Sequence, residues 1–295
     1  MAKNWWKDLR VKITTKEPLK NKTTFKIGGS ALFFCEPKSI TDLSRVVCAA
    51  RKNKIPFRIL GAGSNILVAD KGFKGLVIQL GSPVFRKISL RGSLLEAGSG
   101  VALGKLVQKS AAGGFSGAEF LAGIPGTVGG ALIMNAGAWG QEIAKIVEEV
   151  RVMDYNGTIK TLKKKNIVFS YRSSNLEKYI LLGASFRLTR SNKASIRLAI
   201  HRYLKERRAR KEYAYPNAGC IFKNPEGKSA GRLLDACGLK GARVGGAYIS
   251  ENHANFIVNR NRASASDVRT LMERAKKKVR NKFKVTLRPE IKIWN

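Results

Sequence analysis

The chain of 295 residues has few of the side chains from which metal centres and catalytic triads are built. Its only histidines are His201 and His253, so a serine–histidine triad or a multi-histidine metal site has almost no material. No CxxC pair occurs among its four cysteines, which are Cys35, Cys48, Cys220 and Cys237. We therefore expect reduced thiols, no metal, and an organic cofactor for any demanding chemistry.

The sequence also lacks an apolar run that could cross a membrane or serve as a signal peptide. Its first ten residues, MAKNWWKDLR, contain no such run. We expect a cytoplasmic protein that has no membrane partner. A hydrophobic content of 44% is enough for a sizeable core. At ~150 residues per domain, the length allows two or three domains.

Acidic residues are scarce: 20 Asp and Glu face 56 Lys and Arg, for a formal net charge of +36. Such an excess attracts polyanions, so nucleic acid must be considered as a partner. The basic residues are spread along the chain, however, and no RNA-recognition, KH or zinc-finger pattern is present. We expect a solvated basic surface that draws in phosphorylated small molecules, and no nucleic-acid partner.

Against this charge, residues 121–138, LAGIPGTVGGALIMNAGA, contain no charged side chain at all. Five glycines and a proline make a membrane helix a poor interpretation. Without a Cβ, Gly126, Gly129 and Gly130 can adopt positive φ and offer backbone N–H groups to an anion or a flat ring system. The alternative is a buried, tightly packed turn, whose backbone must find hydrogen-bond partners within the protein.

A second glycine cluster lies in residues 57–68, FRILGAGSNILV. The pattern predicts a strand, a turn and a second strand. It is not the Rossmann dinucleotide fingerprint, because the third glycine is absent and the segment after Asn65 stays apolar instead of beginning a helix. Two uncharged glycine-rich loops fit best with one large cofactor that is held at two places.

Apolar periodicity predicts a mixture of helices and strands, and so an α+β fold. Helical spacing begins at Leu43, at Leu103, at Ile196 and, after a capping box formed by Ser264 and Asp267, at Val268. The helix from Ile196 is expected to reach Lys211 and to lead into a separate carboxy-terminal unit. Strands are expected at residues 75–80, 147–154 and 180–188.

Seven short motifs follow one another along the chain: TTFKIGGSA (23–31), LGAGSNILV (60–68), AGIPGTVGGALIMNAGAWG (122–140), YRSS (171–174), NAGCIFKNP (217–225), HANFIVN (253–259) and RPE (288–290). Together they resemble the UDP-N-acetylenolpyruvoylglucosamine reductases, flavoenzymes of bacterial peptidoglycan synthesis. The resemblance runs from Lys22 to Ile291 and is closest to the family's shorter subtype.

This resemblance implies an FAD-binding domain of the vanillyl-alcohol-oxidase (PCMH) type at residues 1–190, with subdomains at about 1–80 and 81–190. A smaller α+β substrate-binding domain is expected at residues 191–295. FAD is the implied cofactor and NADPH the hydride donor. The residues that match the family's FAD loops are Gly61, Ala62, Gly63, Ser64, Asn65, Ile66, Gly123, Ile124, Pro125, Gly126, Thr127, Val128, Gly129, Gly130, Asn135, Gly137 and Ala138.

The implied reaction reduces the enolpyruvyl ether of a UDP-sugar, and three residues match the family's catalytic positions. Arg172 would bind the substrate carboxylate, where negative charge develops after hydride transfer. Cys220 would donate the proton, since an ordinary thiol with a pKa near ~8.5 is protonated at pH 7. Glu290 would polarise the intermediate or relay a proton. Taken without their motifs, these residues could be a surface arginine, a small buried side chain and a strand-end ion pair.

Lys223, Asn224 and His253 are carried over as contacts to the UDP-sugar or NADPH, and we expect a monomer. Three departures from the family pattern occur: NLEK follows YRSS, Trp294 stands where glycine is common, and Cys220 replaces a frequent serine. Another flavin oxidase on the same fold remains an alternative, as does a basic RNA-binding protein. Absorbance of bound flavin in the purified protein separates the enzyme from the RNA-binding protein.

Overall fold

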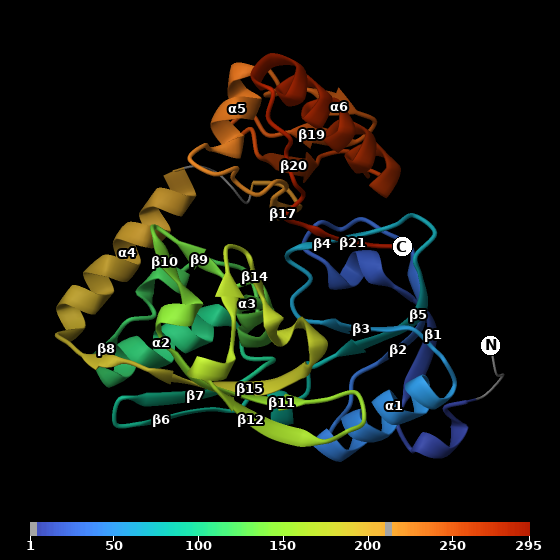
Figure 1. Ribbon diagram of the computed structural model, residues 1–295, viewed down its shortest axis with the longest axis vertical. Coiled ribbons are helices and arrows are strands. Elements are labelled where there is room, and N and C mark those ends of the chain that lie inside the picture. The colour runs from blue at the N-terminus through green and yellow to red at the C-terminus, as the bar shows by residue number, and fades with distance from the viewer. Residues whose placement is uncertain (1–4, 210–213) are drawn as a thin grey trace. The chain divides into compact units, whose positions relative to one another are not determined.

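The computed structural model describes residues 5–209 and 214–295 (Figure 1), and the chain divides into two compact units. The first unit consists of residues 1–15, 33–62 and 75–206. The second consists of residues 16–32, 63–74 and 207–295.

One sheet, most of which belongs to the first unit, has four strands in the order β1-β2-β5-β3. Strands β3 and β5 are parallel, with Phe57 opposite Leu76. Helix α1 begins after Ser39, whose hydroxyl accepts a hydrogen bond from the Asp42 amide, and it buries Leu43, Val46 and Val47. The bounds are β1 Ile13–Pro18, β2 Ser30–Cys35, α1 Ile40–Lys52, β3 Phe57–Leu60 and β5 Phe73–Gln79.

The other large sheet of the first unit has five strands in the order β12-β11-β15-β7-β6, and neighbouring strands pair antiparallel. Helices α2 and α3 lie on the same side of this sheet (Figure 1). Together they enclose an apolar core that includes Leu106, Val128, Val150 and Phe186. The bounds are β6 Ile88–Arg91, β7 Leu94–Gly98, α2 Leu103–Gly113, α3 Val128–Ile133, β11 Val147–Met153, β12 Ile159–Lys163 and β15 Ile180–Arg187.

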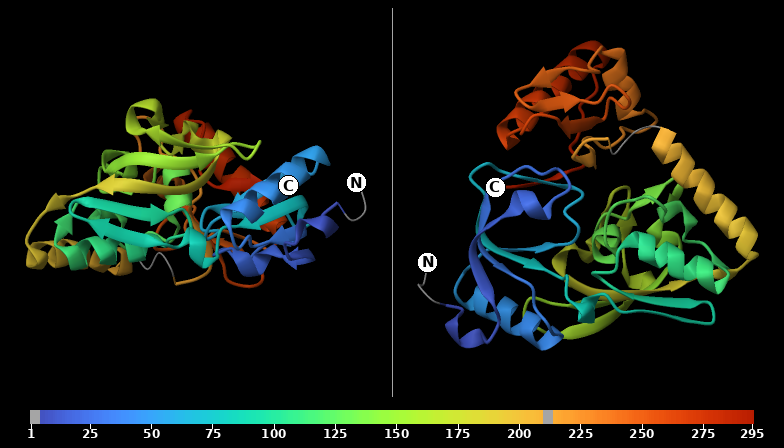
Figure 2. Two further views of the ribbon diagram at one scale, coloured as in Figure 1. Left: turned by 90° about the horizontal axis from the view of Figure 1, so that it is seen from below. Right: turned by 180° about the vertical axis from the view of Figure 1, so that it is seen from behind.

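Short two-stranded pairs and helix α4 complete the first unit. Helix α4, Lys193–Ala209, buries Ile196 and Tyr203 and can be followed from the front and from behind (Figures 1 and 2). The pairs are β8 Phe115–Ser116 with β16 Thr189–Arg190, β9 Gly137–Ala138 with β10 Gln141–Glu142, and β13 Phe169–Ser170 with β14 Ser173–Ser174.

The second unit is built on an antiparallel sheet in the order β17-β20-β19-β18. Strand β21 pairs in parallel with β4, although Ile66 and its partner Lys292 lie 226 positions apart in the sequence. Helices α5 and α6 bury apolar side chains in this unit's own core with Phe25, Leu67 and Ile257. The bounds are β4 Ile66–Val68, β17 Asn217–Cys220, α5 Ala230–Ala236, β18 Arg243–Val244, β19 Ala247–Ile249, β20 Phe256–Asn259, α6 Ala265–Phe283 and β21 Lys292–Trp294.

The predicted helices are confirmed where the apolar spacing is regular. Helix α6 begins with the expected capping box, in which the Ser264 hydroxyl and the Asp267 carboxylate each accept a backbone N–H. The strand, turn and strand expected at 57–68 are β3 and β4. Helix α4 starts at Lys193 instead of Ile196, and the expected end at Lys211 lies outside the described residues.

The compact units differ from the expected division after residue 190. Most of α4 belongs to the first unit, and the boundary falls between Glu206 and Arg207. Two early segments, 16–32 and 63–74, belong with the carboxy-terminal part because Phe25, Ile27 and Leu67 are buried in its core. Among the described residues, the helices include none with the length and apolarity to span a bilayer.

Cys35 and Cys48 provide a test of the packing of the first unit. Cys35 is 1% exposed, and burial, with a smaller contribution from Glu36, raises the pKa of its thiol to about 12. Cys48 is exposed. Since the thiolate is the reactive form, iodoacetamide at pH 7 to 9 should label Cys48 and leave Cys35 unmodified until the protein unfolds. Peptide mass spectrometry measures both sites, and equal labelling rates would contradict the buried environment of Cys35.

Candidate active site

The two glycine-rich loops meet in the first unit. A Cβ added to Gly61 would lie 2.7 Å from the Thr127 hydroxyl, so a side chain does not fit at this position. The approach joins the end of strand β3 to the N-cap of helix α3, and residues 121–138 bring no charged group to it. A backbone-lined junction of two uncharged loops suits a long cofactor gripped at two places, and so the residues present fit FAD.

The way in which the second loop uses its glycines differs from the expectation. Gly126, Gly129 and Gly130 do not have positive φ; among the glycines of residues 121–130, φ is positive at Gly123, at 72°. The amides of Val128 and Gly129 already donate to the carbonyls of Val101 and Ser99, at 2.9 and 2.8 Å. These two amides therefore take part in packing α3 against the turn after β7, and Gly129 does not offer the free N–H group that was expected of it.

The first loop continues into the second unit after Ala62. Gly63 has φ of 66°, and a Cβ there would lie 2.4 Å from the carbonyl oxygen of Lys22. Glycine is required at this point by both conformation and space. Asn65 follows, and its side-chain amide donates to the carbonyl of Glu290 at 3.2 Å, while its own carbonyl accepts the Lys292 amide at 2.9 Å. A residue of the expected FAD loop thus holds the segment that carries Glu290.

Asn135 ends the second loop and is 1% exposed, with φ of 43°. Its side-chain amide donates to the Glu142 carboxylate at 2.8 Å and to the Ser170 carbonyl at 3.1 Å, and its side-chain oxygen accepts the Ala144 amide at 3.3 Å. The Asn135 side chain is therefore fully occupied within the protein. Gly137 and Ala138 follow as strand β9.

Arg172 lies in the two-residue turn of the β13–β14 hairpin, where Ser170 pairs with Ser173. Its φ is 55°, a conformation that side chains other than glycine, asparagine and aspartate seldom adopt. The guanidinium carbon is 5.2 Å from the centroid of the Tyr171 ring, within range of a cation–π contact. The turn therefore presents Arg172 in a defined, strained conformation, unlike an ordinary surface arginine.

Cys220 and Glu290 come together in the second unit. Cys220 ends strand β17, and the next three residues run beside residues 288–290. The Glu290 amide donates to the carbonyl of Ile221 at 2.7 Å, and the Lys223 amide donates to the carbonyl of Arg288 at 2.9 Å. The NAGCIFKNP and RPE motifs, which are far apart in sequence, therefore form adjacent backbones.

Asn255 is a residue of this region that sequence reasoning missed. It is 3% exposed, its side-chain oxygen accepts the Phe222 amide at 3.0 Å, and its side-chain amide donates to the Phe222 carbonyl at 2.8 Å. His253, an expected ligand contact, accepts the Asn255 amide on Nδ1 at 3.2 Å. Asn224, also an expected contact, accepts the Ala230 amide at the start of α5 at 2.9 Å. The available signal was the position of Asn255 inside the HANFIVN motif.

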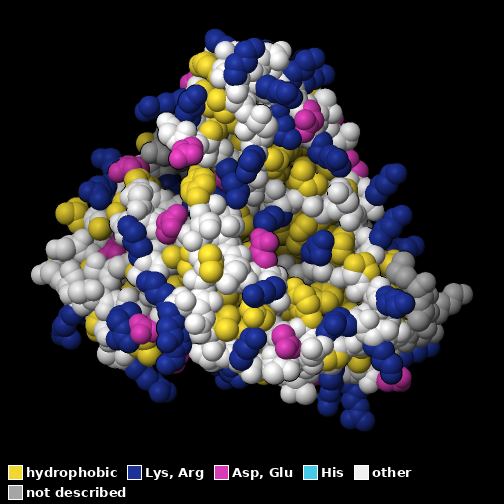
Figure 3. Space-filling view, in the orientation of Figure 1, with side chains coloured by type: hydrophobic (Ala, Val, Ile, Leu, Met, Phe, Trp, Pro, Cys, Tyr) yellow, Lys and Arg dark blue, Asp and Glu magenta, His cyan; other side chains and the backbone are white. Residues whose placement is uncertain are grey.

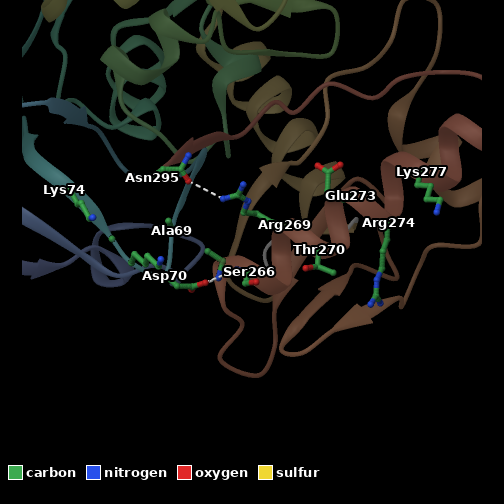
Figure 4. Close-up of a pocket in the computed structure, with 13 residues that line it drawn as sticks. Ala69, Asp70, Lys74, Ser266, Arg269, Thr270, Glu273, Arg274, Lys277 and Asn295 are labelled. Atoms are coloured by element: carbon green, nitrogen blue, oxygen red, sulfur yellow. Dashed lines mark hydrogen bonds between the residues drawn. The ribbon is translucent and has the colours of Figure 1, made fainter.

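A pocket of about 1000 Å³ also lies in the second unit, but none of the motif-matched catalytic residues lines it (Figure 4). Its two acidic side chains are engaged: Asp70 accepts the amides of Ala265 and Ser266 at the start of α6, and Glu273 pairs with Lys276 at 2.7 Å. The lining is basic, with Lys71, Lys74, Arg269, Arg274 and Lys277. This pocket is therefore a basic feature separate from the candidate active site.

Comparisons with known proteins agree with this arrangement. Residues 31–163 match the model of an FAD binding domain. The glucose dehydrogenase Phl p 4.0202 is 14% identical with a TM-score of 0.50, covers 65% of this chain and is covered for 45% of its own length, a likeness that shows the fold alone. The chain is thus an α+β flavoprotein of the PCMH type.

The family follows from residues 211–294, which match the UDP-N-acetylenolpyruvoylglucosamine reductase C-terminal domain. UDP-N-acetylenolpyruvoylglucosamine reductase 2 of Symbiobacterium thermophilum is 43% identical over 96% of this chain and 92% of that protein. The UDP-N-acetylenolpyruvoylglucosamine reductase of Moorella thermoacetica is 40% identical over 97% of this chain and 94% of that protein. The crystal structure of MurB from Thermus caldophilus has a TM-score of 0.83 at 37% identity, and the match covers 97% of this chain and 99% of that chain. The chain belongs to the UDP-N-acetylenolpyruvoylglucosamine reductase family.

Gly129→Val tests the packing of α3. The new Cβ would lie 3.1 Å from the Ser99 Cβ and 3.2 Å from the Ser99 carbonyl oxygen, so this contact must give by a few tenths of an ångström, and the larger valine side chain adds to the crowding at α3. We expect a loss of about 1–3 kcal/mol in unfolding free energy, together with reduced FAD retention. Thermal unfolding and the flavin-to-protein absorbance ratio measure both. In the matched variant Gly104→Val, the added Cβ in α2 has no atom within 4 Å. Equal behaviour of the two variants would contradict close packing at Gly129.

Proposed function

We propose that Arg172, Cys220 and Glu290 carry out the chemistry on the enolpyruvyl ether. As a member of its family, the chain is an FAD- and NADPH-dependent oxidoreductase that reduces UDP-N-acetylenolpyruvoylglucosamine in the synthesis of peptidoglycan precursors. The residues of the two glycine-rich loops would hold FAD, which when bound would supply the hydride chemistry that links NADPH to the methylene carbon of the ether. The observation that carries the proposal is the pairing of the Cys220 and Glu290 segments through the 2.7 Å hydrogen bond between the Glu290 amide and the Ile221 carbonyl.

Arg172 binds the carboxylate of the enolpyruvyl group in this proposal. Hydride addition leaves negative charge on the neighbouring carbon, and this charge is shared with the carboxylate. Guanidinium stays cationic and offers paired donors, so its attraction strengthens as the charge develops. The strained turn supports this role because it holds Arg172 before the substrate arrives.

Cys220 donates the proton that completes the reduction, and Glu290 polarises the intermediate or relays the proton. The two share neighbouring backbones, so one substrate carbon can lie within reach of both. Lys223, Asn224 and His253 bind the UDP-sugar or NADPH around them. The hydrogen bonds that Asn224 and His253 accept from backbone amides support this role, because they hold both side chains in defined positions beside the same segments.

We also propose that the protein acts as a monomer in the cytoplasm, in the cell-wall synthesis on which cell shape and division depend. The basic surface is spread over both units, and Figure 3 shows Lys and Arg side chains scattered over the visible face. This distribution supports general attraction of phosphorylated ligands over a dedicated nucleic-acid groove.

The role proposed for Cys220 can be tested by measuring the two half-reactions separately. Cys220→Ala should leave flavin reduction by NADPH nearly intact and slow reoxidation by the enolpyruvyl sugar by ~10²–10⁴, the usual worth of a general acid. Cys220→Ser should be milder, since a hydroxyl can donate a proton from the same position. Stopped-flow flavin absorbance follows each step.

Cys237→Ala is the matched control, because Cys237 is another half-buried cysteine of the second unit and matches no catalytic position. It should retain the parental rate in both steps. Reoxidation of Cys220→Ala at the parental rate would make Cys220 a packing residue and leave Glu290 or a water as the proton source.

Salt provides a separate test of the net charge of +36. At physiological ionic strength the Debye length is ~8 Å, so added salt screens the attraction between a basic surface and phosphates. The KM values for NADPH and for the UDP-sugar should rise from low to high potassium chloride, while kcat changes less. KM values that stay constant across the series would count against electrostatic capture.

A further inference from the structure

The hairpin that presents Arg172 depends on contacts outside itself. Each of its strands, Phe169–Ser170 and Ser173–Ser174, has only two residues, and such short isolated hairpins are at best marginally stable in water. Two side-chain hydrogen bonds connect it to the end of helix α3. Asn135 donates to the Ser170 carbonyl at 3.1 Å, and the Ser174 hydroxyl donates to the Ile133 carbonyl at 3.1 Å.

We infer that Asn135 is a positioning residue that sets the place of Arg172 relative to the flavin loop. This inference rests on the role proposed above for Arg172. Asn135 belongs to a segment that matches the family's FAD loops, yet its side chain reaches the residue two positions before Arg172. A single buried amide therefore connects the cofactor segment with the turn that presents the catalytic arginine.

The geometry favours a positioning role over simple burial of a polar group. The Asn135 amide divides its two protons between Glu142, in strand β10, and Ser170, in strand β13. The bond to Glu142 and the bond that the side-chain oxygen accepts from the Ala144 amide together close the chain reversal after α3. That reversal would be complete without Ser170. The bond to Ser170 serves only the hairpin, and it is the one that fixes the base of the Arg172 turn.

The exact position of the Arg172 guanidinium matters because a misplacement of 1 Å in a catalytic group can lower the reaction rate ~10²-fold. Loss of the Ser170 bond leaves the hairpin connected to α3 through the Ser174 hydroxyl. Arg172 would then sample a wider range of positions around the substrate carboxylate. Only the step in which that carboxylate gains charge should suffer. Hydride transfer from NADPH to the flavin does not involve the enolpyruvyl group.

Asn135→Ala in the FAD-loaded full chain is the first test. We expect reoxidation by the enolpyruvyl sugar to fall at least tenfold more than flavin reduction by NADPH, together with a higher KM for the sugar. Asn53→Ala is the matched control, because it removes a comparable amide-to-carbonyl bond in the same unit, from Asn53 to Ala49 at the end of α1. It should slow neither step selectively. Equal slowing of both steps in Asn135→Ala would overturn the inference.

A swapped pair separates the two bonds of Asn135. In Asn135→Asp/Glu142→Gln, the new carboxylate accepts the Ala144 amide and the side-chain amide introduced at position 142, so the reversal after α3 is rebuilt with the same total charge. Aspartate tolerates the left-handed conformation at this position. The Ser170 carbonyl loses the Asn135 donor and faces a carboxylate oxygen, which repels it. We expect parental flavin content, a folded protein of lower thermal stability, and reoxidation still selectively slow, whereas parental reoxidation would overturn the inference.

Two further variants complete the design. Glu142→Gln alone keeps an acceptor for Asn135 and should reoxidise at close to the parental rate, which excludes an effect of the lost charge. Arg172→Ala is measured in parallel to distinguish the two proposals. If Arg172→Ala reoxidises normally, the proposed role of Arg172 fails. If it is slow while both Asn135 variants are parental, Arg172 is catalytic and the positioning inference alone is wrong.

Discussion

The loops of this protein depend on one constraint: backbone groups outside helices and sheets still need hydrogen-bond partners, and asparagine side chains supply them. An asparagine amide both donates and accepts, so one side chain can close a loop and reach a second segment. Asn135 does this for the Arg172 hairpin, Asn65 for the Glu290 segment and Asn255 for the residues after Cys220. Each segment that matches a catalytic motif is thus held by an amide from another motif.

Much of the fold follows from local patterns. The stripe from Val268 to Val279 and the capping box before it predict helix α6, since amphipathic spacing and N-terminal capping are local effects. Residues 63–74 could not be assigned to the second unit in this way, because the partners of Leu67 and Asn65 are more than two hundred residues away. In the glycine segment, Gly129 packs closely on Ser99, and no sequence pattern distinguishes such packing from contact with a ligand.

Positively charged side chains occur in two different surroundings in this structure. In the pocket beside α6, both acidic side chains are bound to partners in the protein, which leaves the basic side chains of the lining to set the local potential. Among the motif-matched residues, Arg172 lies on a strained turn. Net charge acts over a long range and without fixed orientation, whereas the position of a cation on such a turn is set by backbone geometry.

The parallel pairing of β4 with β21 has a consequence for the order of folding. All segments of the first unit lie before residue 207, so this unit could become compact while the rest of the chain is still being synthesised. The second unit cannot complete its strand pairing until residues 292–294 have been synthesised, because these residues form the partner strand of β4. Such a long-range contact is slow to form. Residues 63–66 of the flavin loop, which lead into β4, must therefore reach their final structure among the last steps of folding.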